Sequence, residues 1–205
     1  MTQQSTTNIV TVAWRRLDLP GHDQARLRRE PRTWHLEGQA DFHDGSVHWK
    51  LSYAVVCALD WTTLSAEVHG GRDGARIDVI LARSTSGRWS LNGLDVPAVT
   101  GCSDVDLAFT PATNLLALRR LGLAVGQAAE VTAAWLTFPE FALTPLRQRY
   151  RRTSQTVYAY AAPDHGFAEA LTVSSEGFVL DYPGLWRAES RPDMSLPPKR
   201  VSHHG

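Results

Sequence analysis

Apolar and polar side chains alternate with a period of two residues through the middle of the chain. One face of this stretch carries the apolar residues Val47, Trp49, Leu51, Tyr53 and Val55. Such alternation is typical of a β-strand with one buried face. Further runs of this kind cover residues 61–68, 76–83 and 88–91. Gly70 and Gly71 follow the first of these runs and are expected to turn the chain. The pattern therefore predicts a β-meander.

A second series of strand candidates follows Asn92 and Gly93, a pair that suits a tight hairpin turn. Extended structure is expected at residues 104–109, 130–138, 146–161, 169–174 and 177–180. The one helix candidate begins at Thr110 and Pro111, where a capping residue precedes a proline, and continues toward Gly122. The protein is therefore expected to be mainly β, with at most one or two short helices.

A chain of 205 residues is long enough to bury one sizeable core. The two edge strands of a large sheet expose unpaired backbone N–H and C=O groups, and closure of the sheet into a roll or barrel commonly removes or protects these edges. We expect a single-domain antiparallel spiral β-roll or barrel-like sheet at residues 9–188, with an apolar interior. Polar, poorly packed termini are expected at residues 1–8 and 189–205.

The charge balance narrows the range of partners. Lys plus Arg and Asp plus Glu are 21 each, so no net field draws the chain to nucleic acid. The longest apolar run, residues 53–59, is too short to span a bilayer. The uncharged polar start lacks the pattern of a secretory signal, which favours a cytoplasmic location and reduced thiols at Cys57 and Cys102. Whether the protein is a monomer or a dimer stays open.

Two acidic residues and several arginines are the charged candidates for a site. Asp104 and Asp106 share a strand face, where they can act as an acid and base pair on sugars, hold a divalent cation, or simply pair with an arginine. The arginine candidates for gripping the phosphate or carboxylate of a lipid headgroup are Arg119, Arg120, Arg147, Arg149, Arg151 and Arg152. The alternative is a solvated strand face or internal salt bridges.

Aromatic and amide side chains form a second group of ligand-binding candidates. The aromatic candidates are Trp61, Trp135, Tyr150, Tyr158 and Tyr160. Flat rings with a polar tip line sugar and lipid sites, although they also fill ordinary β cores. Asn114 is a further candidate, and its simplest role is to shape the loop beside it.

No familiar catalytic or cofactor motif is present. The sequence has no nucleophile elbow, phosphate-binding loop or dinucleotide fingerprint, so no catalytic residue and no cofactor is expected. His43 and His48 flank a turn and are expected not to share a strand face, so no metal site is expected. Cys57 and Cys102 are expected to be small core residues rather than nucleophiles.

The block Gly101–Leu107, continued by Phe109–Asn114 and Leu118–Leu121, resembles the putative glycolipid-binding family, first defined as a domain of unknown function. Shorter matches occur at Trp14, Asp60–Thr62, Gly87–Trp89, Ala134–Trp135, Arg149–Tyr150, Tyr158–Tyr160 and Asp181–Pro183. The resemblance covers residues 12–187. It implies a single-domain β-roll, likened to lipoprotein and lipid carriers, with an apolar interior.

Three functions compete at this point. The first is non-catalytic binding of a lipid, glycolipid or similar amphiphile in the roll interior, with arginine and aromatic contacts to its headgroup. The second is an enzyme that acts on a sugar or phosphoester through Asp104 and Asp106. The third is a protein-interaction module that works through an exposed sheet edge. The first is the preferred hypothesis, and it requires an apolar cavity.

Overall fold

The structure, a computed structural model, describes residues 9–189. The polar termini expected at residues 1–8 and 189–205 lie outside the described residues, apart from Glu189. Within residues 9–189, fifteen strands form one sheet. They are β1 (Ile9–Arg16), β2 (Gly21–Arg29), β3 (Thr33–Asp44), β4 (Val47–Ala58), β5 (Thr63–Arg72), β6 (Ala75–Arg83), β7 (Trp89–Leu91), β8 (Leu94–Asp95), β9 (Val105–Leu107), β10 (Ala128–Leu136), β11 (Leu143–Arg152), β12 (Val157–Ala162), β13 (Phe167–Val173), β14 (Val179–Tyr182) and β15 (Trp186–Ala188).

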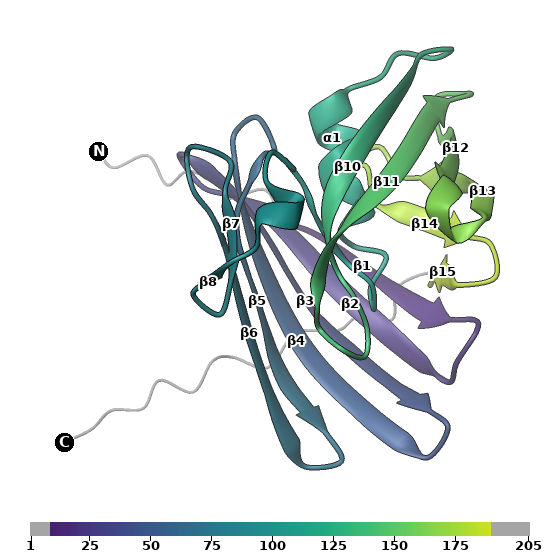
Figure 1. The fold of residues 1–205 in the computed structure, drawn as a ribbon. Coiled ribbons are helices and arrows are strands. Elements are labelled where there is room, and N and C mark those ends of the chain that lie inside the picture. The colour runs from purple at the N-terminus through teal and green to yellow at the C-terminus, as the bar shows by residue number, and fades with distance from the viewer. Residues whose placement is uncertain (1–8, 190–205) are drawn as a thin grey trace, which may run out of the picture.

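The prediction of a mainly β protein with an antiparallel meander is confirmed. Sequence neighbours pair along both halves of the sheet, and the halves join where β1 pairs with β15. Among the described strands, the one parallel pair is β9 with β10. The sheet is a curved roll that does not close into a barrel, and β8 and β9 are its two edges. Figure 1 shows β1–β6 as a broad curved sheet with the β10–β11 hairpin crossing in front of it.

Several boundaries differ from the sequence expectations. Three strands before residue 47 were not expected, because their inward positions include small or polar residues such as Asp23 and Ala25. Gly70 and Gly71 do not turn the chain but continue β5, and the turn falls at Asp73 and Gly74. The run at 146–161 contains two strands, β11 and β12, which pair as a hairpin.

The helix expected after Pro111 is confirmed as α1 (Asn114–Leu121). It ends at Gly122, whose φ of 53° lies in the left-handed region that favours glycine. The helix side chains Leu115 and Leu116 are fully buried. Two short 3₁₀ turns complete the described elements, Pro97–Val99 and Pro163–His165.

The core lies on the concave face of the long strands. The alternating residues Trp49, Leu51, Tyr53 and Val55 are all buried, as the sequence pattern predicts. The tip of the β10–β11 hairpin closes part of this face: the Phe138 ring lies 4.6 Å from Trp49, measured between centroids. The concave face is thus filled by side chains over much of its area.

Candidate functional site

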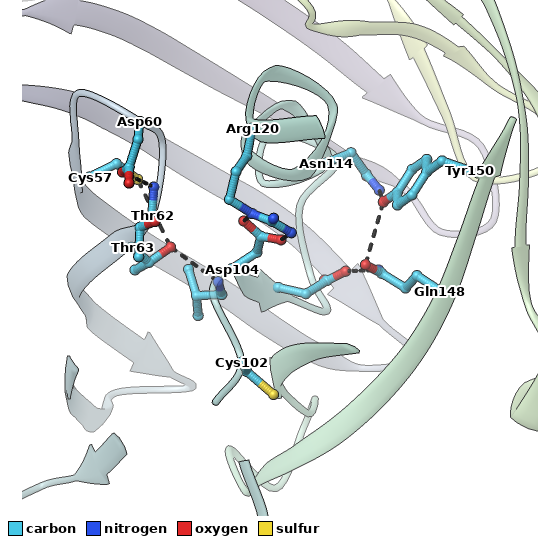
Figure 2. A network of polar contacts seen from close by, with 12 residues as sticks. Cys57, Asp60, Thr62, Thr63, Cys102, Asp104, Asn114, Arg120, Gln148 and Tyr150 are labelled. Carbon is cyan, nitrogen blue, oxygen red and sulfur yellow. Dashed lines mark hydrogen bonds and ion pairs between the residues drawn. The ribbon is translucent and has the colours of Figure 1, made fainter. Parts of the chain in front are cut away.

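The carboxyl of Asp104 lies just before β9 and is held by α1. Arg120 donates from Nε and Nη2 to the two oxygens of Asp104, at 2.7 and 2.6 Å. The Asp104 side chain is only 2% exposed, and the hydrogen bonds raise the pKa of Arg120. Figure 2 shows the two charged groups face to face beneath the helix. Asp104 is therefore committed to a closed ion pair.

Asp106 has a different environment, although it is only two residues away. Its Oδ2 accepts a hydrogen bond of 2.7 Å from Gln148, whose Nε2 also donates to the Tyr160 hydroxyl at 3.1 Å. Burial raises the pKa of Asp106 to about 6, with a smaller contribution from the charge of Asp104. The residue is half-buried, and among the described side chains Gln148 is its one hydrogen-bond donor. This carboxyl keeps hydrogen-bonding capacity for a ligand.

Three tyrosines lie near enough to Asp106 for its charge to act on their hydroxyls. The Tyr150 and Tyr160 rings lie 5.0 Å apart, and Tyr182 lies 6.0 Å from Tyr160. Burial raises the pKa of each phenol, and the charge of Asp106 adds to the effect. We call this group the tyrosine–aspartate cluster, and it consists of Asp106, Gln148, Tyr150, Tyr160 and Tyr182.

Asn114 joins this cluster from the first turn of α1. Its amide nitrogen lies 3.4 Å from the Tyr150 hydroxyl, which in turn lies 3.5 Å from Oε1 of Gln148 (Figure 2). Helix, β11 and β12 are therefore linked through one chain of amides and phenols. Such a chain offers both donors and acceptors to a polar ligand.

Trp135 stands beside Asp106 on the neighbouring strand. The two residues are partners in the parallel β9–β10 register, which places their side chains on the same face. Trp135 is half-buried, and His165 packs edge-on against its ring at 4.9 Å. A partly accessible indole next to a carboxyl and an amide is a combination suited to a sugar ring.

Arg147, Arg149 and Arg151 of β11 alternate with Gln148 and Tyr150 and lie on the opposite face of the strand, whereas Arg152 shares the face of these two residues. Arg147 and Arg149 are exposed and form ion pairs with Asp164 and Glu130. They line a pocket of about 180 Å³ together with Glu130, Val131, Thr132, Gln148 and Pro163. This pocket is small and mostly polar, so it is not the apolar interior that the sequence reasoning expected.

The remaining candidates fall into two separate stacks. Trp61 is buried against Trp34, with ring centroids 4.4 Å apart, and Arg119 lies 5.0 Å from the Trp61 ring. Tyr158 is buried beneath Arg152, whose guanidinium lies 5.5 Å from the ring and also donates to the Leu123 carbonyl. Neither stack touches the tyrosine–aspartate cluster through a hydrogen bond recorded in residues 9–189.

Sequence reasoning missed two polar residues of the interior, Gln148 and Asp23. Asp23 has no exposed surface, and its Oδ1 accepts from the Tyr53 hydroxyl at 2.9 Å. Burial raises the pKa of Asp23 to about 8, while hydrogen bonds from Thr110 and Tyr53 oppose the shift. Both residues lie on the buried face of a strand. A polar residue in the sequence at a position where the alternation predicts an apolar one is the signal that could have identified them.

Residues 9–189 contain neither a cluster of metal-binding side chains nor a helix that could cross a membrane. No group of three His, Cys, Asp or Glu side chains in residues 9–189 could hold a metal ion. His43 and His48 do share a sheet face, contrary to expectation, because the hairpin sets them opposite each other with rings 4.4 Å apart. None of the described helices is both long and apolar enough to cross a membrane.

Comparisons with known proteins agree with this fold. The family model named "Putative glycolipid-binding" matches residues 11–188. A solved structure of a DUF1089 family protein from Pseudomonas aeruginosa is similar, with a TM-score of 0.71 and 31% sequence identity. The match covers 80% of this chain and 91% of that one. Among curated proteins, none matches.

Proposed function

Because this chain belongs to the putative glycolipid-binding family, we propose that it binds a glycolipid or similar amphiphile without altering it chemically. In this proposal the tyrosine–aspartate cluster holds the polar headgroup. The observation that supports it best is the Asp106 carboxyl, which belongs to a half-buried residue and has one hydrogen-bond donor, the Gln148 amide, among the described side chains.

The donors and acceptors of the cluster match a sugar. A sugar hydroxyl donates one hydrogen bond and can accept two, so it needs a neighbouring acceptor as well as donors. Asp106 supplies the acceptor, and the Tyr160 hydroxyl, which accepts from Gln148, keeps its own proton to donate. The half-buried ring of Trp135 offers a flat apolar surface for the C–H face of a sugar.

The charges near Asp106 favour a neutral headgroup. Asp106 is acidic and would repel an anionic headgroup. Arg120 already donates two hydrogen bonds to Asp104. Arg149 lies on another strand face and is paired with Glu130. A neutral sugar therefore suits this cluster better than a phosphate, and the headgroup contacts differ from the arginine contacts expected from the sequence.

The structure argues against the enzyme hypothesis, because that hypothesis needs two accessible carboxylates and Asp104 is not accessible. A pair of carboxyls that shares acid and base work needs both groups accessible to substrate. Asp104 is 2% exposed and bound through both oxygens to Arg120. We therefore propose binding, with Asp106 as a ligand contact.

The test is native mass spectrometry of the full chain purified from its own host, followed by organic extraction. We expect a co-purified amphiphile, and at least a tenfold loss of occupancy in Asp106→Asn, because hydrogen bonds to a charged group contribute about 1.5–3 kcal/mol. Trp135→Ala is expected to lose occupancy as well. Arg149→Ala, on the exposed face, is the matched control and keeps the ligand. A ligand-free mass in repeated preparations contradicts the proposal.

A further inference from the structure

Besides the tyrosine–aspartate cluster, a group of side chains on the concave face contains buried polar atoms without a hydrogen-bond partner among residues 9–189. Arg16 stands opposite Trp186 in the register, Phe42 stands opposite Trp49, and Trp49 stands opposite Arg72. The Arg16 guanidinium lies 4.5 Å from the Phe42 ring and 5.1 Å from the Trp186 ring. We call these five residues the concave row. It runs across the sheet at the level of the hairpin tip.

Gly21 makes the contact between Arg16 and Phe42 possible. It stands opposite Phe42 in the β2–β3 register, and a Cβ at this position would lie 2.2 Å from the Phe42 Cβ. No side chain therefore separates β1 from β3 at this level of the concave face. Arg16 occupies that space with its guanidinium.

Three buried polar atoms in and beside the concave row have no hydrogen-bond partner among residues 9–189. They are Nη1 of Arg16, Nε1 of Trp49 and Oδ2 of Asp23. Trp49 is 3% exposed and Asp23 is 0% exposed. Arg16 is near enough to Asp23 for its charge to act on that carboxyl. Native interiors satisfy nearly all such groups, so three in one region point to a ligand.

The hairpin tip packs two aromatic rings against Phe42 and Trp49 of the concave row. Phe138 lies 5.4 Å from Phe42 and 4.6 Å from Trp49, and Phe141 lies 6.2 Å from Trp49. Both phenylalanines are only half-buried, because they sit in the turn between β10 and β11. Turns of this kind open more easily than the strands that they connect.

The three atoms define the chemistry of an occupant. Two of them, on Arg16 and Trp49, are donors. Burial raises the pKa of Asp23 to about 8, so its carboxyl is mostly protonated at neutral pH, and the unpartnered oxygen can still accept a hydrogen bond through a lone pair. A hydroxyl, with one donor and two acceptor positions, complements this set. Arg16 already donates to both oxygens of Asp18, at 2.9 and 3.0 Å, so its charge is compensated. The surrounding rings suit the C–H face of a sugar.

We propose that the concave row and Asp23 form a second ligand site, which takes a neutral hydroxyl-bearing group such as a sugar ring when the Phe138–Phe141 tip lifts. Apart from Trp186 in β15, the residues of this site lie in β1–β5, and none of them belongs to the tyrosine–aspartate cluster. Its occupant binds through Arg16 and Trp49 as donors and through the protonated Asp23 carboxyl, with Phe42 beneath it.

The indole N–H of Trp49 is the reporter for a test on the ¹⁵N-labelled full chain. Its resonance is assigned as the one lost in Trp49→Phe, which keeps a ring in place. The probes are octyl glucoside and octanoate, both below their micelle concentrations, because they share a tail and differ in the headgroup. We expect a saturable shift of this resonance with octyl glucoside and none with octanoate.

Variants separate this site from the first one. Arg16→Gln, which keeps the Trp49 reporter, is expected to weaken octyl glucoside binding about tenfold at this site, and Phe141→Ala is expected to speed exchange. Asp106→Asn leaves the Trp49 shift in place even if the tyrosine–aspartate cluster fails to bind. Arg149→Ala is the neutral control.

Two outcomes would overturn the second site. If the Trp49 resonance does not shift with octyl glucoside, the three atoms bind only water. This conclusion holds whether or not the tyrosine–aspartate cluster binds a ligand. An equal response to octanoate means that the site recognises an anion or the alkyl tail rather than a hydroxyl.

Discussion

Arg120 donates to both oxygens of Asp104, at 2.7 and 2.6 Å, and this ion pair fixes α1 to the strand that carries Asp106. The guanidinium and carboxylate are planar groups that fit each other through two parallel hydrogen bonds. The pair is buried on the Asp104 side, with 2% exposure. Of the two neighbouring carboxyls, Asp104 therefore has a structural role, and Asp106 is the candidate ligand contact.

Removal of Arg120 should destabilise the protein strongly, since it leaves Asp104 buried and unpaired. We expect Arg120→Ala to cost about 3–5 kcal/mol of unfolding free energy, measured by urea denaturation. The matched control is Arg149→Ala, which breaks an exposed pair with Glu130 and should cost less than about 1 kcal/mol. Equal losses in the two variants would show that the Asp104 pair does not stabilise the fold.

Asp23 gives a pH dependence with a definite sign. Its pKa of about 8 lies above the value of about 3.9 in an unfolded chain, so the folded state holds the proton more tightly. Asp23 therefore makes its full contribution to the unfolding free energy below the unfolded pKa. This contribution falls as the pH rises toward 8, by up to about 1.4 kcal/mol per pH unit. Below pH 6, Asp106 contributes with the same sign.

The variant Asp23→Asn isolates this contribution, because the amide is neutral at every pH. We expect the stability difference between the variant and the parent chain to change steadily between about pH 5 and about pH 8 in urea denaturation series. A difference that stays constant over this interval would mean that Asp23 does not titrate in it.

Gly38 is required by the ring of Tyr53 on the next strand. A Cβ at residue 38 would lie 2.2 Å from Cζ and from the hydroxyl oxygen of Tyr53. Gly38→Ala therefore displaces the phenol that donates to Asp23, and we expect a loss of about 1–3 kcal/mol. Thermal denaturation measures it. The control Gly45→Asn, at a left-handed position in open space, should change stability by about 0.5 kcal/mol or less.

The two cysteines should be unreactive while the protein is folded. Burial raises the pKa of Cys57 to about 12 and also raises the pKa of Cys102. The thiolate is the nucleophile, so iodoacetamide at neutral pH should modify both residues far more slowly than in urea. Mass spectrometry of the alkylated chain measures this, and Cys57→Ser assigns the signals. Rapid labelling of Cys57 in the folded chain is the result that contradicts this prediction.

Local pattern was enough to predict some elements and not others. The strand at Val47–Ala58 alternates cleanly, and its buried face follows from the sequence alone. The strand at Gly21–Arg29 buries Asp23 next to Ala25, and a polar inward residue hides the alternation. Its partner Tyr53 lies 30 residues away, so no local rule could identify the reason for that carboxyl.

The same limit applies to the candidate site. Asp104 and Asp106 were singled out from the sequence, but their partners Arg120 and Gln148 lie 16 and 42 residues further along. Only the fold shows that one carboxyl is paired with an arginine and the other with an amide. The exposed arginines on both sides of Gln148 give this stretch the sequence of a charged strand face, and nothing local marks the amide between them as buried.

The junction of β1 with β15 also affects how the protein is made. Trp14 stands opposite Ala188, and its indole nitrogen donates to the Val179 carbonyl, 165 residues later. The hairpins on either side can form while the ribosome is still extending the chain. β1, however, keeps one bare edge until β15, the last strand described, has been synthesised. A nascent chain of this protein therefore exposes the hydrogen-bonding groups of β1 throughout most of its synthesis, which is when a chaperone would be of most use to it.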